Sequence, residues 1–175
     1  MESLRDILNI RAADTFIVNC PLSTVHYIRW GVSVECKSLI REAIQARENS
    51  WSPYSGFMVG AALLGVSGRV YRGCNIENAA YSPTNCAERT AFFKAISDGE
   101  RKFTAIAIAG WPKDGEPGFA YPCGVCRQTM MEFCEPESFK IIVARSEEEF
   151  TSHTLAELLP HGFGPDNLKQ HSCKE

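Results

Sequence analysis

A nearly uninterrupted apolar run, FMVGAALL at residues 57–64, limits the architectures open to this chain. A run of this length fits a single β-strand, and because it has no polar face, both sides of that strand are expected to be covered. The whole apolar stretch, residues 57–66, reaches about half of the roughly 20 residues that a membrane-spanning helix needs. The run therefore predicts an internal strand of a sheet that carries a layer on each face.

Segments with helical and strand periodicity surround this run in an alternating order. Apolar residues spaced three and four apart predict a helix over residues 33–49, and Ser67 and Gly68 predict a hairpin turn into a second strand at residues 69–76. Further helices are expected at residues 85–98, 122–134 and 155–159, and further strands at residues 103–109 and 139–144. This order predicts an α/β fold of three layers, α/β/α, with a mixed central sheet.

Length, composition and charge favour a single globular domain. The 175 residues, 45% of them hydrophobic, suffice for one domain with a full core. We expect this domain at residues 33–168, an N-terminal extension of unknown role at residues 1–32 and a polar tail at residues 169–175. A formal net charge of −3 without a Lys- or Arg-rich run disfavours a nucleic-acid partner. The sequence shows no secretory signal and no membrane span, which predicts a cytoplasmic protein with no membrane partner.

Three of the eight cysteines form a candidate metal site. Cysteines in a chain without a secretory signal are more often thiols or metal ligands than a disulfide framework. Cys123 and Cys126 form a C-x-x-C motif, which by itself also fits a redox dithiol or half of a structural zinc site. This motif and Cys86 are both expected at helix starts, where partial positive charge favours the thiolate form.

Glu88, two residues after Cys86, favours a catalytic zinc site over a redox dithiol or a structural zinc site. Three thiolates leave one position of a tetrahedral zinc ion open, which is the pattern of catalytic sites. A carboxylate beside that position can act as a general acid and base, whereas a redox motif or a closed zinc site has no use for it. A structural site would need a fourth ligand, and the four histidines lie outside the metal motifs: His26, His153, His161 and His171.

These residues carry a resemblance to a known family. The runs CAERTA at residues 86–91 and PCGVCRQ at residues 122–128 resemble the signature of the cytidine deaminases, in the three-cysteine form of small homotetrameric enzymes. Similar runs lie at residues 52–57, 73–78 and 157–165. The resemblance covers roughly residues 35–168, and it implies a three-layer cytidine-deaminase-like domain.

The resemblance implies a zinc-dependent hydrolase of pyrimidine salvage. One Zn²⁺ per chain would be held by Cys86, Cys123 and Cys126, and Glu88 would carry protons between the attacking water and the base. The products from cytidine and deoxycytidine would be uridine and deoxyuridine, with ammonia. Arg89 would donate hydrogen bonds to the thiolates and so offset their negative charge.

Substrate-binding positions also follow from the resemblance. Asn75 and Glu77 match residues that hold the ribose hydroxyls, and Phe57 matches a residue that lines the pyrimidine pocket. The backbone N–H of Ala87 and the carbonyl of Tyr121 match groups that read the edge of the base. Phe163 matches an aromatic residue that packs on the base bound by a neighbouring subunit, which implies a homotetramer with shared active sites.

The chain departs from the family pattern at a few positions. Tyr121 precedes Pro122 and Cys123 where a small Ser or Thr is expected, and residues 82–85 are more polar than expected. Three alternatives remain at this point: a deaminase of a nucleoside antibiotic, a deaminase of cytosine in polynucleotides, and a catalytically silent zinc-binding homologue. A silent homologue would be expected to have lost Glu88 or a ligand, and this chain retains all four residues.

Overall fold

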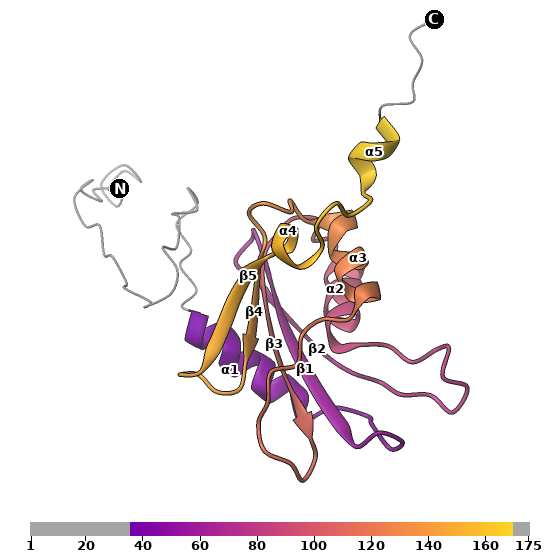
Figure 1. Cartoon of the computed structure of the whole chain (residues 1–175), viewed down its shortest axis with the longest axis vertical. Coiled ribbons are helices and arrows are strands. Elements are labelled where there is room, and N and C mark those ends of the chain that lie inside the picture. The colour runs from indigo at the N-terminus through magenta and orange to yellow at the C-terminus, as the bar shows by residue number, and fades with distance from the viewer. Residues whose placement is uncertain (1–35, 170–175) are drawn as a thin grey trace, which may run out of the picture.

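The structure, a computed structural model, describes residues 36–169 and contains three layers (Figure 1). The expected extension at residues 1–32 and residues 170–175 of the expected tail lie outside the described residues. The strands are β1 (Phe57–Gly65), β2 (Val70–Cys74), β3 (Phe103–Pro112), β4 (Lys140–Ala144) and β5 (Phe150–Thr154). The helices are α1 (Cys36–Arg47), α2 (Ala87–Ser97), α3 (Gly124–Phe133), α4 (Leu155–Leu158) and α5 (Pro165–Lys169).

The five strands form one mixed sheet in the order β2-β1-β3-β4-β5. Strand β1 pairs antiparallel with β2 and β3, β3 pairs parallel with β4, and β4 pairs antiparallel with β5. The apolar run is therefore a central strand, as predicted. Successive side chains of a strand point to opposite faces. Accordingly, Ala61 and Leu63 lie in one core cluster, while Ala62 and Leu64 lie in the other.

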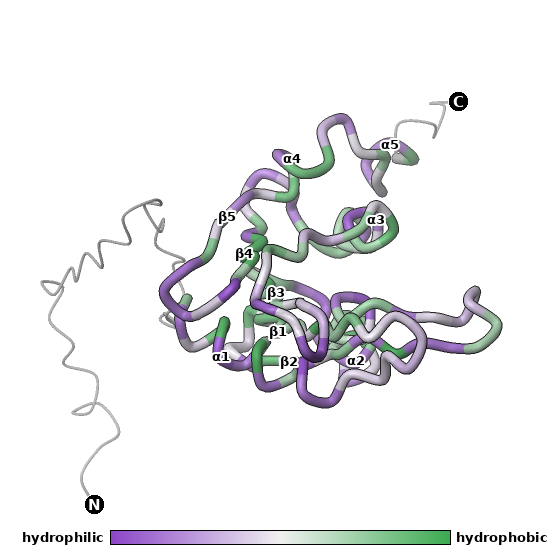
Figure 2. The backbone as a smooth tube through the Cα atoms, turned by 60° about the horizontal axis from the view of Figure 1, so that its bottom comes forward, coloured by the Kyte–Doolittle hydropathy of each residue, from purple (hydrophilic) through white to green (hydrophobic). Residues whose placement is uncertain are grey.

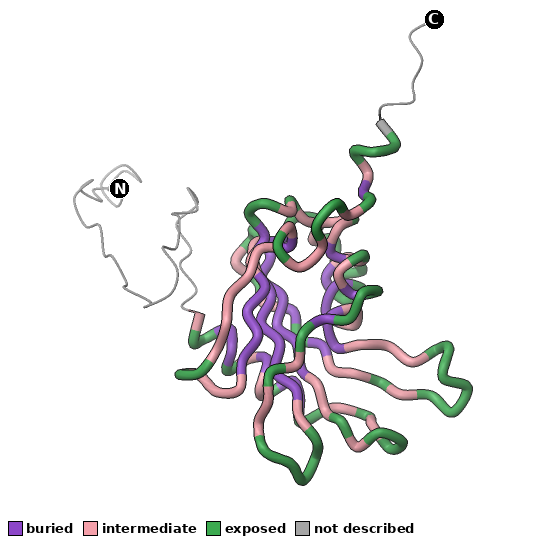
Figure 3. The backbone as a smooth tube through the Cα atoms, viewed as in Figure 1, coloured by how far each residue is buried: buried purple, intermediate pink, exposed green. Residues whose placement is uncertain are grey.

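Helices cover both faces of this sheet, which confirms the predicted α/β/α architecture. On one face, Leu39, Ile40 and Ala43 of α1 pack in a cluster with residues of β1, β3 and β4. On the other face, α2 and α3 enclose the larger cluster, which includes Phe92 and Met130. Figure 2 shows hydrophobic segments gathered along the central strands, and Figure 3 shows the same strands buried while the connecting loops are exposed.

Two glycines allow the helices to approach the sheet closely. A Cβ atom on Gly60 would lie 2.1 Å from the carbonyl oxygen of Ala43 in α1. On the opposite face, a Cβ atom on Gly73 would lie 2.3 Å from the carbonyl oxygen of Ala87, the first residue of α2. Only a residue without a side chain fits either position. Gly73 therefore sets the depth at which the start of α2 lies on the sheet.

The edge strand β5 and the short helix α5 were not predicted from the sequence. The β5 sequence FTSHT is half-buried along its whole length and shows no apolar alternation. An edge strand that is only partly covered does not need the apolar pattern by which strands are recognised. No helix within residues 36–169 is both long and apolar enough to cross a membrane.

Candidate active site

Three cysteine sulfurs converge where α2 and α3 begin. The Sγ atoms of Cys86, Cys123 and Cys126 all lie within 4.8 Å of one another, and those of Cys86 and Cys123 are 3.9 Å apart. A tetrahedral zinc ion with Zn–S bonds of about 2.3 Å requires sulfur–sulfur distances of about 3.8 Å. The three thiols therefore fit one metal ion. Within residues 36–169, no other group of three or more potential ligands is placed in this way.

Both helix starts contribute to the chemistry of these thiols. Cys86 is the N-cap of α2, and Cys123 is the N-cap of α3, where its Sγ accepts a hydrogen bond of 3.4 Å from the backbone N–H of Cys126. Hydrogen bonds with Cys126, Arg89 and Cys123 lower the pKa of Cys86 to about 5. The pKa of Cys126 is raised by its hydrogen bond with Cys86 and by burial. Negative charge is thus held on Cys86 while Cys126 keeps its proton, and a bound cation would favour the loss of that proton.

Glu88 lies beside these thiols in the first turn of α2. It is only 5% exposed, and it and Arg47 are the only buried charged residues in the described part of the chain. Burial, followed by the negative charge of Cys86, raises the pKa of Glu88 to about 7. A carboxyl group with a pKa near neutrality can both accept and release a proton at physiological pH. Its position therefore suits a general acid and base next to a metal ion.

Two arginine side chains donate hydrogen bonds next to the cysteines, one from α2 and one from α3. Arg89 donates from Nη2 to Cys86 Sγ over 3.7 Å and to the carbonyl oxygen of Thr84 over 3.1 Å. The contact required for the predicted role of Arg89 is thus present. Arg127 donates to the carbonyl oxygens of Pro122 and Leu158, over 2.8 and 2.6 Å. This second arginine fixes the turn before Cys123 against α4.

Arg127 was not predicted as part of the site. The only signal available was its position one helical turn after Cys123, on the same helix face. Spacing alone could not show that its guanidinium reaches back to Pro122 and across to Leu158 in α4. That contact depends on how α4 packs, which the sequence pattern does not specify.

Asn75 holds the start of β1 in place through its side-chain amide. Its Oδ1 accepts hydrogen bonds from the backbone N–H of Val59 (2.8 Å) and from the hydroxyl of Ser50 (2.5 Å). Its Nδ2 donates to the carbonyl oxygen of Phe57 over 2.8 Å. This amide therefore organises the backbone next to the expected pyrimidine pocket, and its contact with ribose stays a prediction.

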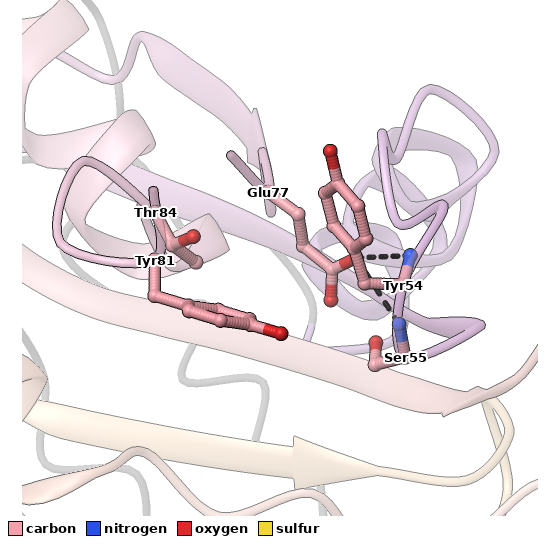
Figure 4. A pocket seen from close by; sticks show the side chains of 5 residues that line it. All are labelled: Tyr54, Ser55, Glu77, Tyr81 and Thr84. Atoms are coloured by element: carbon pink, nitrogen blue, oxygen red, sulfur yellow. Dashed lines mark hydrogen bonds between the residues drawn. The ribbon is translucent and has the colours of Figure 1, made fainter. Parts of the chain in front are cut away.

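Glu77 lies in a pocket of about 260 Å³ that it shares with Tyr54, Ser55, Tyr81 and Thr84 (Figure 4). Its Oε2 accepts hydrogen bonds from the backbone N–H groups of Tyr54 and Ser55, over 2.9 and 3.2 Å. Hydrogen bonds from Ser55 and Tyr54 lower the pKa of this carboxyl group. Glu77 is thus ionised at neutral pH and can accept hydrogen bonds from hydroxyl groups. The cysteines and Glu88 do not line this pocket.

The groups expected to bind the base lie at the starts of β1 and α2 and in the loop before α3. Phe57 begins β1, and its ring flanks Gly110, since a Cβ atom there would lie 3.3 Å from Phe57 Cε1. Ala87 is buried as the first residue of α2, where backbone N–H groups have no intrahelical partner. Tyr121 is half-exposed, and its ring packs against His153. These positions agree with the predicted roles but do not test them.

Phe163 is exposed within the described residues 36–169. Its side chain is 59% exposed, while its carbonyl oxygen accepts a hydrogen bond of 2.8 Å from Gln128 in α3. The segment that carries Phe163 is therefore fixed although the ring itself is not packed in the core. The shared-site prediction requires an accessible ring of this kind, and it stays a prediction.

An α/β/α domain with three thiols at two helix starts, next to a buried carboxyl group, defines the class of zinc-dependent hydrolases with an open metal position. Residues 34–142 match the family described as the cytidine and deoxycytidylate deaminase zinc-binding region, and the chain belongs to this family. The matched region contains all three cysteines and Glu88. Zinc is accordingly the cofactor of the family to which this chain belongs.

Several proteins with the name cytidine deaminase resemble the chain over nearly their full length. The cytidine deaminase of Sporosarcina psychrophila is 49% identical over 135 residues, which cover 77% of this chain and 96% of that protein. The crystal structure of cytidine deaminase from Burkholderia pseudomallei superposes with a TM-score of 0.67 at 41% identity, covering 74% of this chain and 99% of that one. The corresponding Mycobacterium tuberculosis structure has a TM-score of 0.64 at 36% identity, with coverages of 75% and 99%.

Proposed function

We propose that this chain catalyses the hydrolytic deamination of cytidine and deoxycytidine, giving uridine or deoxyuridine and ammonia. The observation that carries this proposal is the convergence of Cys86, Cys123 and Cys126 next to the buried Glu88, whose pKa lies near 7. This arrangement supplies a metal site and a proton carrier in one place. Relatives with the name cytidine deaminase share about half of the sequence over most of the chain.

The three cysteines would hold one Zn²⁺ per chain. The bound zinc ion supplies a Lewis acid that makes water more acidic and therefore a better nucleophile near neutral pH. Three thiolates outweigh the charge of Zn²⁺ and would by themselves oppose this effect. Arg89, which donates to Cys86 Sγ, withdraws part of the negative charge and so restores the acidity.

Glu88 performs the proton transfers of this reaction. It takes a proton from the attacking water and delivers it to N3 of the base while the water oxygen bonds to C4. It then transfers the second proton of the water to the exocyclic nitrogen. The C4–N4 bond breaks, ammonia leaves, and the water oxygen remains as the 4-oxo group of uridine. Burial of Glu88 keeps its pKa close to the pH at which it must work in both directions.

Contacts with both parts of the nucleoside would provide specificity. Glu77 presents an ionised carboxylate to the pocket of Figure 4, where it would accept hydrogen bonds from the sugar hydroxyls, with Asn75 beside it. Phe57 would pack on the pyrimidine ring. The Ala87 N–H and the Tyr121 carbonyl would bind the edge of the base. A free base lacks the sugar contacts and should be a poor substrate.

The same proposal includes the assembly and the cellular setting. We expect a homotetramer in which Phe163 completes a neighbour's site, because the ring is exposed on a segment that Gln128 holds in place. All six cysteines within residues 36–169 are free thiols, which a reducing cytoplasm would preserve. We further expect the catalytic domain at residues 33–168 and a role in pyrimidine salvage.

One assay tests the function. Purified full-length chain is incubated with cytidine, deoxycytidine, cytosine and a cytosine-containing oligonucleotide, and uridine-type product, ammonia and zinc are quantified on the same sample. Equal amounts of uridine and ammonia from the nucleosides, with about one zinc per chain, are expected. Deamination of the oligonucleotide alone would favour the polynucleotide alternative, and bound zinc without turnover would identify a silent homologue.

A further inference from the structure

The loop from β3 to α3, residues 113–123, is attached to the far edge of the sheet through Tyr121. The Tyr121 ring lies against the His153 ring, with centroids 5.7 Å apart and planes inclined by 59°. The Tyr121 hydroxyl lies 3.4 Å from the Thr151 hydroxyl. Both partners belong to β5, so one side chain joins the segment before Cys123 to the edge strand.

The β5 residues that hold Tyr121 lie on the same face of the sheet as the cysteine cluster. Thr151 pairs with Val143 of β4, and His153 pairs with Ile141. Directly paired residues of neighbouring strands point to the same face. Val143 and Ile141 belong to the core beneath α2 and α3, so Thr151 and His153 point to that side as well.

One nitrogen of the His153 ring is shielded from water. His153 Nε2 is buried and has no hydrogen-bond partner within the described residues. A ring nitrogen in this state gains nothing from solvent, and the position of the imidazole depends on packing. The orientation of the His153 ring therefore depends on packing contacts, of which the one with the Tyr121 ring is one.

Other side chains fix the loop on either side of Tyr121. Before it, Arg145 donates from Nε to the carbonyl oxygen of Pro117 over 3.0 Å, and its guanidinium carbon lies 5.7 Å from the centre of the Phe119 ring. After it, Arg127 donates to the carbonyl oxygen of Pro122. The Tyr121 side chain supplies the attachment between these points, at the residue whose backbone would face the base.

We propose that Tyr121 is a positioning residue, whose side-chain contact with β5 fixes the direction of its own backbone carbonyl toward the amino group of the base. This inference rests on the proposed function, in which that carbonyl accepts a hydrogen bond from the amino group. The amino group gains a proton as it leaves, so this hydrogen bond strengthens in the transition state. Uridine has a 4-oxo group and no donor at this position. A misdirected carbonyl should therefore weaken cytidine turnover without weakening uridine binding.

The test compares substitutions on both sides of the contact in zinc-loaded, full-length protein. The variants are Tyr121→Phe, Tyr121→Ser, His153→Ala, the double variant Tyr121→Ser/His153→Ala and the control Ser152→Ala. Ser152 lies on the same strand but pairs with Ile142, which belongs to the opposite core. For each variant, kcat and KM for cytidine and the inhibition constant of uridine are measured.

Tyr121→Ser and His153→Ala should each lower kcat/KM for cytidine about threefold to tenfold, which is the range expected for loss of one aromatic contact. The uridine inhibition constant should change less than about twofold. The double variant should be no worse than Tyr121→Ser, because both substitutions remove one contact. Tyr121→Phe keeps the ring but loses the hydroxyl contact with Thr151, so it should lower kcat/KM less than Tyr121→Ser does. Ser152→Ala should resemble the parent protein.

Equal weakening of cytidine and uridine would show that the contact only maintains the pocket, and it would overturn the inference. Unchanged constants in Tyr121→Ser would overturn it as well. If Tyr121→Ser does not fold, His153→Ala tests the same contact from β5. Absence of turnover in the parent chain would refute the proposed function itself, and this outcome is distinct because it is seen before any substitution is made.

Discussion

At the scale of single residues, the sequence identified the chemical groups but not all of their contacts. Cys86, Cys123, Cys126 and Glu88 were predicted from residue type and spacing, and the structure brings the three sulfurs together next to the carboxyl group. The second role of Asn75 was not predicted. Its amide binds the backbone of β1, and that contact depends on how a distant part of the chain folds back.

Replacing Glu88 by Gln tests the proton carrier. The amide is similar in size but cannot accept and release a proton, so turnover should fall by a factor of about 10²–10⁴ or more, because several steps use this group. Zinc content and folding should be retained, as measured by metal analysis and circular dichroism. Turnover close to that of the parent would rule out Glu88 as the proton carrier. As a contrast, Cys126→Ala should lose zinc and activity together.

Asn75 and Glu77 should respond differently to substitution. Glu77→Gln removes the charge but keeps a side-chain oxygen that can accept from the N–H groups of Tyr54 and Ser55, so it should raise KM for cytidine with little loss of thermal stability. Asn75→Ala removes hydrogen bonds to the backbone at Val59 and Phe57, so it should also lower the stability by about 1–3 kcal/mol. Steady-state kinetics and thermal unfolding measure both effects. Equal unfolding temperatures for the two variants would contradict the structural role of Asn75.

At the scale of helices and strands, the apolar pattern of the sequence was sufficient to predict the buried elements. It was not sufficient to predict an element that is only half-buried. Strand β1 was predicted because burial on both faces gives it an uninterrupted apolar run, and the helices that begin at the cysteines were predicted from their start and stop signals. Strand β5 was missed because its half-buried side chains are mostly polar. The contacts of Tyr121 were therefore missed as well, because both of its partners, Thr151 and His153, belong to β5.

The close packing of α2 against the sheet at Gly73 can be tested by substitution. A methyl group at Gly73 would meet backbone atoms at the start of α2, whereas one at Gly60 would meet α1 on the opposite face. Both Gly73→Ala and Gly60→Ala should destabilise the fold by about 1–3 kcal/mol. Only Gly73→Ala should also weaken zinc affinity, because α2 carries Cys86. Gly118→Ala, with no atom within 4 Å of the added carbon, is the control for thermal unfolding and zinc titration. Equal zinc affinities in the two destabilised variants would refute this coupling.

At the scale of the whole molecule, the proposed homotetramer concerns Phe163, whose side chain is exposed in the single chain. Aromatic side chains that are this exposed in a segment held by a hydrogen bond are suited to an interface. In a closed oligomer, each such ring would reach a neighbour's site. The sequence resemblance suggested this assembly, but a single chain contains no interface from which its geometry could be derived.

Mixed tetramers of Phe163→Ala and Glu88→Gln chains decide whether sites are shared. If Phe163 serves a neighbour, a site with an intact Glu88 can receive an intact Phe163 from the other type of chain. Random 1:1 mixing would then restore about a quarter of all sites to the parent composition, since each of two independent contributions is intact in half of the chains. If Phe163 instead serves its own chain, every intact Glu88 is accompanied by Ala at position 163, and no site is restored. Activity at low cytidine concentration therefore distinguishes the two arrangements, with mixing verified by native mass spectrometry. Verified mixed tetramers without any gain over Phe163→Ala alone, or full activity from a stable monomer, would exclude shared sites.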